Sequence, residues 1–247
     1  MSEGKTTMGA AARRRRKGST TPLALLLLAA FLLAALWAGA VPQRINPLAP
    51  LDLSVARPWF LDWRLAALKH SRARCDATLN GPEIEAAAIS DQPYKDGCGW
   101  TTAVRVTSAG GVRVHADALT CEVAAALAMW LEHDVQAAAL EHLGTRVTGL
   151  QTLGTYACRN IVGSKLWKDF RSQHPTANAI DVSGFVLADG RRLSLRKDWK
   201  GTGPEAQFLR QVHRGACRTF RVALSPDFNA AHHDHFHLDR GFIKACR

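Results

Sequence analysis

The sequence predicts an α+β domain in which helices flank a small antiparallel sheet. Two pairs of apolar segments are joined by turn residues, namely 103–106 with 112–114 across Gly110-Gly111, and 179–187 with 192–196 across Asp189-Gly190. Two long helical patterns, at 119–143 and 204–220, lie between and after these hairpins. Hairpins that are grouped apart from the helices indicate an α+β arrangement rather than a parallel α/β sheet.

A basic block and an apolar run occupy the N-terminus. Arg13–Lys17 precede residues 22–41, an uncharged apolar stretch of about the length that a membrane-crossing helix needs. This order predicts a basic cytoplasmic tail over 1–21 and a transmembrane anchor or signal segment over 22–41, with the rest of the chain sent across the membrane. Ala38-Gly39-Ala40 has the small-x-small form of a cleavage site, so both outcomes stay open, and an uncleaved anchor is favoured.

The segment after the apolar run predicts a linker and then the start of the folded domain. Residues 42–57 hold three prolines and no helical period, which is typical of an extended linker. Residues 58–68 follow with Trp59, Phe60 and Trp63, and they either pack on the domain or lie at a membrane interface. Packing is the favoured interpretation, and the folded domain is predicted to span 58–247.

The remaining elements follow from turn residues and periodicity. Residues 75–116 are rich in strand formers and contain the turn 93–97, whereas 119–143 is rich in alanine and ends at Gly144. A short strand is predicted at 147–153, followed by a polar loop at 160–178. Pro204 suits the first position of the helix 204–220, and a last strand is predicted at 234–239.

The charge of the chain is unevenly distributed. Of 32 basic and 21 acidic residues, six basic residues and one acidic residue lie in 1–41, so the rest of the chain carries a net charge of +6. A modest basic surplus suits a polyanionic neighbour such as a polymer of the cell wall or a membrane surface. No basic helix and no aromatic-plus-basic motif is present, so a nucleic-acid partner is not expected.

The six cysteines are predicted to form disulfides. All of them follow the apolar run, where an even number of cysteines indicates up to three bridges in an oxidising compartment. No two of them form a C-x-x-C pair, which argues against a cysteine zinc knuckle. The sequence leaves open how they pair, and they are Cys75, Cys98, Cys121, Cys158, Cys217 and Cys246.

Histidines cluster near the C-terminus. Four of the ten lie between positions 232 and 237. On a strand over 234–239, His235, His237 and Asp239 share one face, with Phe236 and Leu238 on the other. Two imidazoles side by side suit a zinc site, or a general base next to a metal ligand. Asp239 is placed to orient one of these two histidines, while His232 and His233 are expected to face solvent.

Two further candidate ligands lie just before and within the predicted strand 179–187. His174 lies in the polar loop, and Asp181 lies on the strand between two apolar residues. If the loop folds back, the imidazole and the carboxylate meet at one ion. Together with His237 they supply three protein ligands and leave one position vacant, which is the catalytic form of a zinc site.

Five segments carry a resemblance to a known family. They are Cys98–Trp100, Leu153–Arg159 (LGTYACR), His174–Phe185 (HPTANAIDVSGF), Asp198-Trp199 and Leu224–Asp239 (LSPDFNAAHHDHFHLD). Over residues 58–246 the chain resembles the bacterial extensin-like C-terminal domain family. That family in turn resembles the metallopeptidase group of lysostaphin, D-alanyl-D-alanine carboxypeptidases and hedgehog. The group's pattern, H-x6-D followed by H-x-H, falls on His174, Asp181, His235 and His237.

The resemblance implies a hedgehog-like or D-Ala-D-Ala peptidase-like fold with Zn²⁺ bound by His174, Asp181 and His237. It also implies that Arg159 contacts the substrate carbonyl. The catalytic base is either Asp234, three residues before the last ligand, or His235. Strand alternation places Asp234 on the opposite face, so His235 is the favoured base.

We therefore expect a monomeric, zinc-dependent peptidoglycan peptidase that cleaves stem peptides or crosslinks as an endopeptidase or a carboxypeptidase. Its expected location is the inner membrane, with one span and the C-terminal domain in the periplasm, or the periplasm alone if the N-terminal segment is cleaved. The alternative is a non-catalytic envelope module that binds the cell wall or a protein partner. The sequence does not distinguish between DD and LD bonds.

Overall fold

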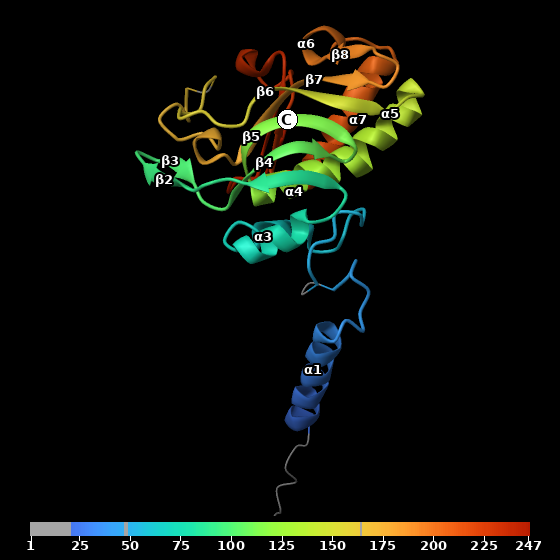
Figure 1. The fold of residues 1–247 in the computed structure, drawn as a ribbon, viewed down its shortest axis with the longest axis vertical. Helices are drawn as coiled ribbons and strands as arrows, with labels where there is room; N and C mark the ends of the chain where they lie inside the picture. The colour runs from blue at the N-terminus through green and yellow to red at the C-terminus, as the bar shows by residue number, and fades with distance from the viewer. Residues whose placement is uncertain (1–20, 47–48, 164) are drawn as a thin grey trace, which may run out of the picture.

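The computed structural model describes residues 21–46, 49–163 and 165–247, and within them one large mixed sheet forms the centre of an α+β fold (Figure 1). Its strands run in the order β1-β4-β5-β6-β7-β10-β9-β11, and β8 pairs with β7. They are β1 (Ile84–Ala88), β4 (Ala103–Ala109), β5 (Val112–Thr120), β6 (Val147–Gly154), β7 (Ala179–Leu187), β8 (Arg192–Ser194), β9 (Val222–Leu224), β10 (Phe236–Asp239) and β11 (Ala245–Cys246). A separate hairpin is formed by β2 (Gln92–Lys95) and β3 (Cys98–Trp100).

The prediction of a small, antiparallel sheet is wrong in both respects. The sheet has nine strands, and the pairs β5–β6 and β9–β11 are parallel. The helical segment between β5 and β6 returns the chain to the end of the sheet where β5 began, so β6 runs parallel to β5. The strands β9 and β11 were missed because three and two residues are too few to show an alternating pattern, whereas β1 lies in the strand-rich region predicted at 75–116. Both predicted hairpins are confirmed, as β4–β5 and β7–β8.

Helices cover the sheet where alanine-rich and amphipathic segments were predicted. The predicted helix 119–143 consists of α4 (Cys121–Trp130), a π-helical turn (Leu131–Val135) and α5 (Gln136–Leu143). It begins at Cys121 because Thr120 still belongs to β5, and the Thr120 hydroxyl accepts a hydrogen bond from the Val123 amide at 3.4 Å. It ends at Gly144, which adopts the left-handed conformation (φ 66°).

The amphipathic helix α7 (Pro204–Thr219) starts at Pro204 as predicted and packs against α4 and α5. Its apolar face contributes Phe208 and Val212 to the core. At the centre of that core, Trp130 donates its indole hydrogen bond to the Val212 carbonyl at 2.9 Å. Short helices complete the fold, namely α2 (Leu61–Ala66), α3 (Arg72–Leu79) and α6 (Leu195–Asp198).

The predicted transmembrane helix over 22–41 is not found. Helix α1 (Thr21–Trp37) has 17 residues and ends before Gly39, which adopts a left-handed conformation (φ 72°). Within the described residues, none of the helices is both long enough and apolar enough to cross a membrane. The predicted basic tail lies almost wholly outside the described residues.

The region predicted as a linker is fixed to the domain. In its described part, residues 42–46 and 49–57, it contains neither helix nor strand, yet Leu51 and Leu53 are buried in the core. The guanidinium of Arg64, itself buried on α2, donates to the carbonyls of Gln43, Ala49 and Pro50. These contacts hold the segment against the fold.

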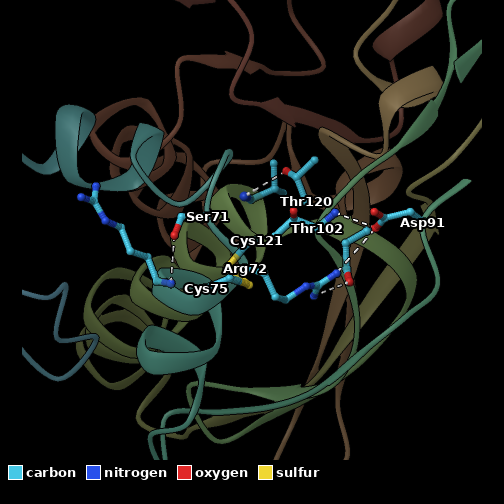
Figure 2. Close-up of a disulfide and its surroundings, with 10 residues drawn as sticks. Ser71, Arg72, Cys75, Asp91, Thr102, Thr120 and Cys121 are labelled. Atoms are coloured by element: carbon cyan, nitrogen blue, oxygen red, sulfur yellow. Dashed lines mark hydrogen bonds and ion pairs between the residues drawn. A yellow bond between two sulfur atoms is a disulfide. The ribbon is translucent and has the colours of Figure 1, made fainter. Parts of the chain in front are cut away.

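The six cysteines form the three predicted disulfides. The pairs are Cys75–Cys121, Cys98–Cys158 and Cys217–Cys246. Figure 2 shows Cys75 and Cys121 joining α3 to the start of α4, next to Ser71, whose hydroxyl caps α3 by accepting from the Arg74 amide. The second bridge joins β3 to the segment that carries Arg159.

His213 on α7 gives a prediction about acid stability. Its ring is buried between Trp199 and Phe236 and lies 3.2 Å from the Ala223 carbonyl, and burial lowers the pKa of the imidazole. The folded state therefore keeps this ring neutral, whereas the unfolded state binds a proton below a pH of about 6.5. The neutral, buried ring therefore contributes to the free energy of unfolding above a pH of about 6.5, and this contribution is lost as the pH falls.

We expect His213→Gln to flatten the fall in the free energy of unfolding between pH 7 and pH 5. A single group contributes at most about 1.4 kcal/mol per pH unit. Denaturant unfolding at the two pH values measures this slope, and His115→Gln, an exposed site on β5, is the matched control. A wild-type slope in His213→Gln would contradict the assignment.

Candidate metal centre

Two neighbouring strands and one turn bring together the three predicted ligands. In the antiparallel pair β7–β10, Asp181 lies directly opposite His237, and Asp181 Oδ1 is 2.9 Å from His237 Nδ1. His174 lies in the 3₁₀ turn His174–Thr176 that precedes β7. Its Nε2 lies 3.2 Å from Asp181 Oδ2 and 3.2 Å from His237 Nδ1. The structure therefore places all three side chains at one point, as the sequence predicted.

The turn that carries His174 is fixed by Asn178. The Asn178 amide donates to Gln173 Oε1 at 2.9 Å, and its Oδ1 accepts from the Thr120 hydroxyl at 2.8 Å. Between them Ala177 takes a left-handed conformation (φ 53°), which folds the chain back toward β7. Asn178 thus ties the ligand loop to the end of β5.

In His174 and His237, the ring nitrogen that faces away from Asp181 (the outer nitrogen) lies within hydrogen-bond distance of an oxygen acceptor. His174 Nδ1 lies 3.2 Å from the Thr155 carbonyl, and His237 Nε2 lies 2.9 Å from Asp239 Oδ2. Asp239 in turn accepts from the Gly241 amide at 2.8 Å. When these nitrogens carry the protons, His174 Nε2 and His237 Nδ1 each keep a lone pair that could bind a metal ion beside Asp181, which is how metal-binding histidines are usually held.

The donor set fits zinc. Two imidazole nitrogens and a carboxylate are ordinary zinc ligands, and three of them leave one position open. Zinc–ligand bonds of about 2.0–2.1 Å in a tetrahedron correspond to ligand–ligand distances of roughly 3.3 Å. The observed separations of 2.9–3.2 Å between the three donors are close to that value.

The electrostatics of the centre favour a cation. Burial lowers the pKa of His237, but hydrogen bonds with Asp181 and Asp239 outweigh it and raise the pKa to about 9. Burial raises the pKa of Asp181, but hydrogen bonds with His174 and His237 outweigh it and hold the pKa well below its usual range. All four side chains are buried. A positive charge between the two carboxylates is therefore stabilised, whether a proton or a metal ion carries it.

The predicted base lies beside the three ligands. His235 immediately precedes β10, which begins at Phe236 rather than at 234, and its Nε2 lies 3.7 Å from Asp181 Oδ1. Its Nδ1 lies 3.0 Å from Asp234 Oδ1, which fixes the ring with Nε2 toward the centre. Asp234 therefore contacts the ring nitrogen of His235 that faces away from the centre. Arg159 Nη2 lies 3.8 Å from Asp181 Oδ2 with the side chain partly exposed.

His232 was expected to face solvent, and that expectation is wrong. Its ring is buried, with its centroid 5.2 Å from that of His235 and 5.9 Å from that of His237. Burial, followed by the neighbouring His237 and His235, lowers the pKa of His232 to about 4. Asn229 Oδ1 lies 2.7 Å from His232 Nδ1, and Asn229 is the N-cap of the 3₁₀ turn Ala230–His232. The N-cap residue Asn229 was the available sequence signal. His233 is exposed, as expected.

A cleft of about 310 Å³ opens onto the centre. His232, His235, His237 and Asp239 all line it, so the three side chains predicted to share a face do so. Most of its wall is apolar and comes from the loop after Arg159 and from the C-terminal segment, including Ile161, Val162, Trp167, Phe228, Phe242 and Ile243. Three guanidinium groups also line it, those of Arg159, Arg171 and Arg247.

The sequence favours a place in the core for Trp100, Trp130, Trp167 and Trp199, since large aromatic side chains are mostly buried, but Trp167 departs from that expectation. Its side chain is 47% exposed and stacks edge-on against Phe170 at the wall of the cleft. Trp130 and Trp199 are buried as predicted, and Trp100 is half-buried against Tyr156. Trp167 therefore forms part of the cleft wall.

A second group with metal-ligand chemistry is His213 with Cys217 and Cys246. The two sulfurs form a disulfide, so they offer no thiolate to a metal. In the parts of the chain that the structure describes, the other such group is His174, Asp181 and His237.

Comparison with known proteins gives one family. The sequence matches the family described as "Extensin-like protein C-terminus" over residues 73–247, which contain every residue of the centre. Comparisons with curated proteins and with solved structures give no match.

Proposed function

This chain belongs to the extensin-like C-terminal family, and we propose that it is a zinc-dependent peptidase that hydrolyses peptidoglycan peptides. One observation carries the proposal, namely that two imidazoles and a carboxylate converge within 2.9–3.2 Å of one another, with the remaining nitrogen of each imidazole beside an oxygen acceptor, and that one of the three side chains, His237, lines a cleft. A catalytic zinc site has three protein ligands and a fourth position for water or substrate, and the cleft beside His237 would give a substrate access to such a position.

His174, Asp181 and His237 would hold the zinc ion. When bound, zinc polarises a substrate carbonyl and lowers the pKa of a water molecule toward neutrality. Asp239 fixes the orientation of the His237 ring through its 2.9 Å contact, and the Thr155 carbonyl does the same for His174.

The remaining chemistry belongs to side chains of the cleft. His235, held by Asp234 at 3.0 Å, presents Nε2 to take a proton from the attacking water and return it to the leaving amine. Arg159 provides a permanent positive charge next to the centre, where it stabilises the developing oxyanion. His232, neutral at physiological pH, lines the cleft next to His235 and accepts a hydrogen bond from a substrate N–H group.

The cleft suits the proposed substrate class. Stem peptides of peptidoglycan carry free carboxylates and alanine methyl groups. The guanidinium groups of Arg159, Arg171 and Arg247 match the carboxylates, and the apolar wall matches the methyl groups. The proposal covers both an endopeptidase and a carboxypeptidase.

The cellular location is proposed on the same basis. Three disulfides suit an oxidising compartment outside the cytoplasm. The basic block and apolar helix at the N-terminus are the order of an export segment. We therefore place the folded domain in the periplasm, where peptidoglycan is accessible.

The test is digestion of purified muropeptides by the full chain, followed by chromatography and mass spectrometry. We expect His235→Gln to lower kcat by about 10²- to 10⁴-fold, because a general base is lost while the ligands stay in place. Zinc content should be unchanged in this variant. His233→Gln, an exposed neighbour, is the matched control with wild-type activity.

Unchanged hydrolysis in His235→Gln would contradict the assignment of the base. Absence of any cleavage by a zinc-loaded wild-type protein would instead favour the alternative, a non-catalytic module that binds the cell wall or a protein partner.

A further inference from the structure

Three aromatic side chains project from the start of helix α2 into solvent. Trp59, Phe60 and Trp63 are 59%, 55% and 53% exposed, although their neighbour Leu65 is fully buried. The segment was predicted to pack on the domain or to lie at a membrane interface, with packing favoured; it packs through Leu65 and Leu68, whereas its three aromatic side chains face outward. A cluster of exposed aromatic side chains on a folded protein marks an interaction surface.

Hydrogen bonds place this cluster beside the C-terminal end of α1. The Trp59 amide donates to the Arg44 carbonyl at 2.7 Å. Two residues farther along, the Asn46 side chain donates to the Leu36 carbonyl, in the last turn of α1, at 2.7 Å. Arg64 also contacts the Gln43 carbonyl at 3.2 Å. The aromatic cluster and the end of α1 therefore belong to one connected structure.

Helix α1 is itself apolar on every side. It contains no charged residue, and none of its residues is buried by the domain. Figure 1 shows it standing apart from the folded domain, on the side that carries α3. A helix without a polar face is stable only in an apolar environment. The aromatic cluster thus lies beside the C-terminal end of α1, a helix that needs an apolar environment.

The chemistry around the cluster suits a lipid surface. Trp rings prefer the boundary between headgroups and acyl chains, where their apolar bodies and polar N–H groups are both accommodated. Arg44 and Arg57 flank the cluster and are exposed, so that they can pair with anionic headgroups. A second copy of the chain would offer the same aromatic and basic groups, which do not complement themselves in charge.

We propose that Trp59, Phe60 and Trp63, together with the end of α1, dock the domain on the surface of an anionic membrane. Docking fixes the orientation of the domain relative to the bilayer. The inference does not depend on hydrolysis and requires no membrane-spanning helix.

Quenching of tryptophan fluorescence by brominated lipid tests the docking. The parent is the full chain with Trp37→Phe, which removes the reporter on α1, mixed with vesicles of phosphatidylethanolamine and phosphatidylglycerol brominated near the glycerol backbone. We expect quenching in the parent, and loss of about half of it or more when Trp59→Phe and Trp63→Phe are added. Trp167→Phe, which removes an exposed tryptophan at the cleft, is the control and should leave the quenching unchanged.

Three outcomes would overturn the proposal. The first is a parent without quenching, and the second is a Trp59→Phe/Trp63→Phe variant with the parent's quenching. The third is loss of quenching in Trp167→Phe, which would place the cleft face on the lipid. Sedimentation of the same proteins without lipid identifies a second copy as the occupant if the double substitution dissociates a dimer.

Discussion

Asp181→Asn is expected to lower kcat/KM for muropeptides by about three orders of magnitude. The amide keeps the size of the carboxylate but removes the negative charge that lies within 3.2 Å of both imidazoles. An amide oxygen is a weak zinc ligand, and the Lewis acid that would be lost is worth several kcal/mol in the transition state. Steady-state hydrolysis of a defined muropeptide measures the effect.

The matched control is Asp189→Asn, at the turn that follows the same strand. Asp189 is exposed, and its carboxylate holds only Arg191, so hydrolysis should remain at the wild-type level. Circular dichroism and thermal unfolding establish that both variants fold. A folded Asp181→Asn protein with wild-type hydrolysis would exclude Asp181 from the reaction.

Trp130→Ala is expected to give the largest loss of stability. The side chain is fully buried, packs against Phe185 and Phe220, and donates to the Val212 carbonyl. Truncation leaves a cavity and removes the indole hydrogen bond, which together cost about 3–5 kcal/mol of the free energy of unfolding. This is a large share of the stability of a typical domain, about 5–15 kcal/mol.

Denaturant unfolding with the disulfides intact checks this value. Trp59→Ala removes an exposed tryptophan and is expected to change the free energy of unfolding by no more than about 0.5 kcal/mol. Equal losses in the two variants would mean that the packing around Trp130 does not stabilise the fold in the way described.

The three predicted ligands could be named from the sequence because strand alternation and motif spacing select them, although they lie up to 63 positions apart. His237 and Asp181 each lie on an apolar strand whose alternation sets the direction of the side chain. His174 follows from its spacing to Asp181 and from the resemblance to a known motif. Direct pairing of β10 with β7 then brings the three side chains together, and the sequence analysis did not predict this pairing.

Other features depend on turns and tertiary contacts that the strand patterns do not show. His232 is buried because a 3₁₀ turn capped by Asn229 directs it inward, whereas the strand predicted at 234–239 begins after it and gave no direction for its side chain. The size of the sheet was underestimated because β9 and β11 have only three and two residues. The disulfide pairing depends on the fold of the whole chain, since each bridge joins residues at least 29 positions apart.

The aromatic residues were misassigned for a related reason. Trp59, Phe60 and Trp63 have the composition of a core segment, and composition alone does not show that the core is already filled. In the structure Leu65 and Leu68 occupy the inward positions of this segment, so the larger rings remain outside.

Zinc content tests the central claim most directly. The full chain would be purified without chelator, equilibrated with one equivalent of zinc, desalted and analysed for metal beside His237→Ala. The account predicts one zinc ion per wild-type chain and none in the variant, because the variant keeps only two of three ligands. A folded, disulfide-bonded wild-type protein that retains no zinc would contradict the assignment of the metal centre and, with it, the proposed hydrolysis.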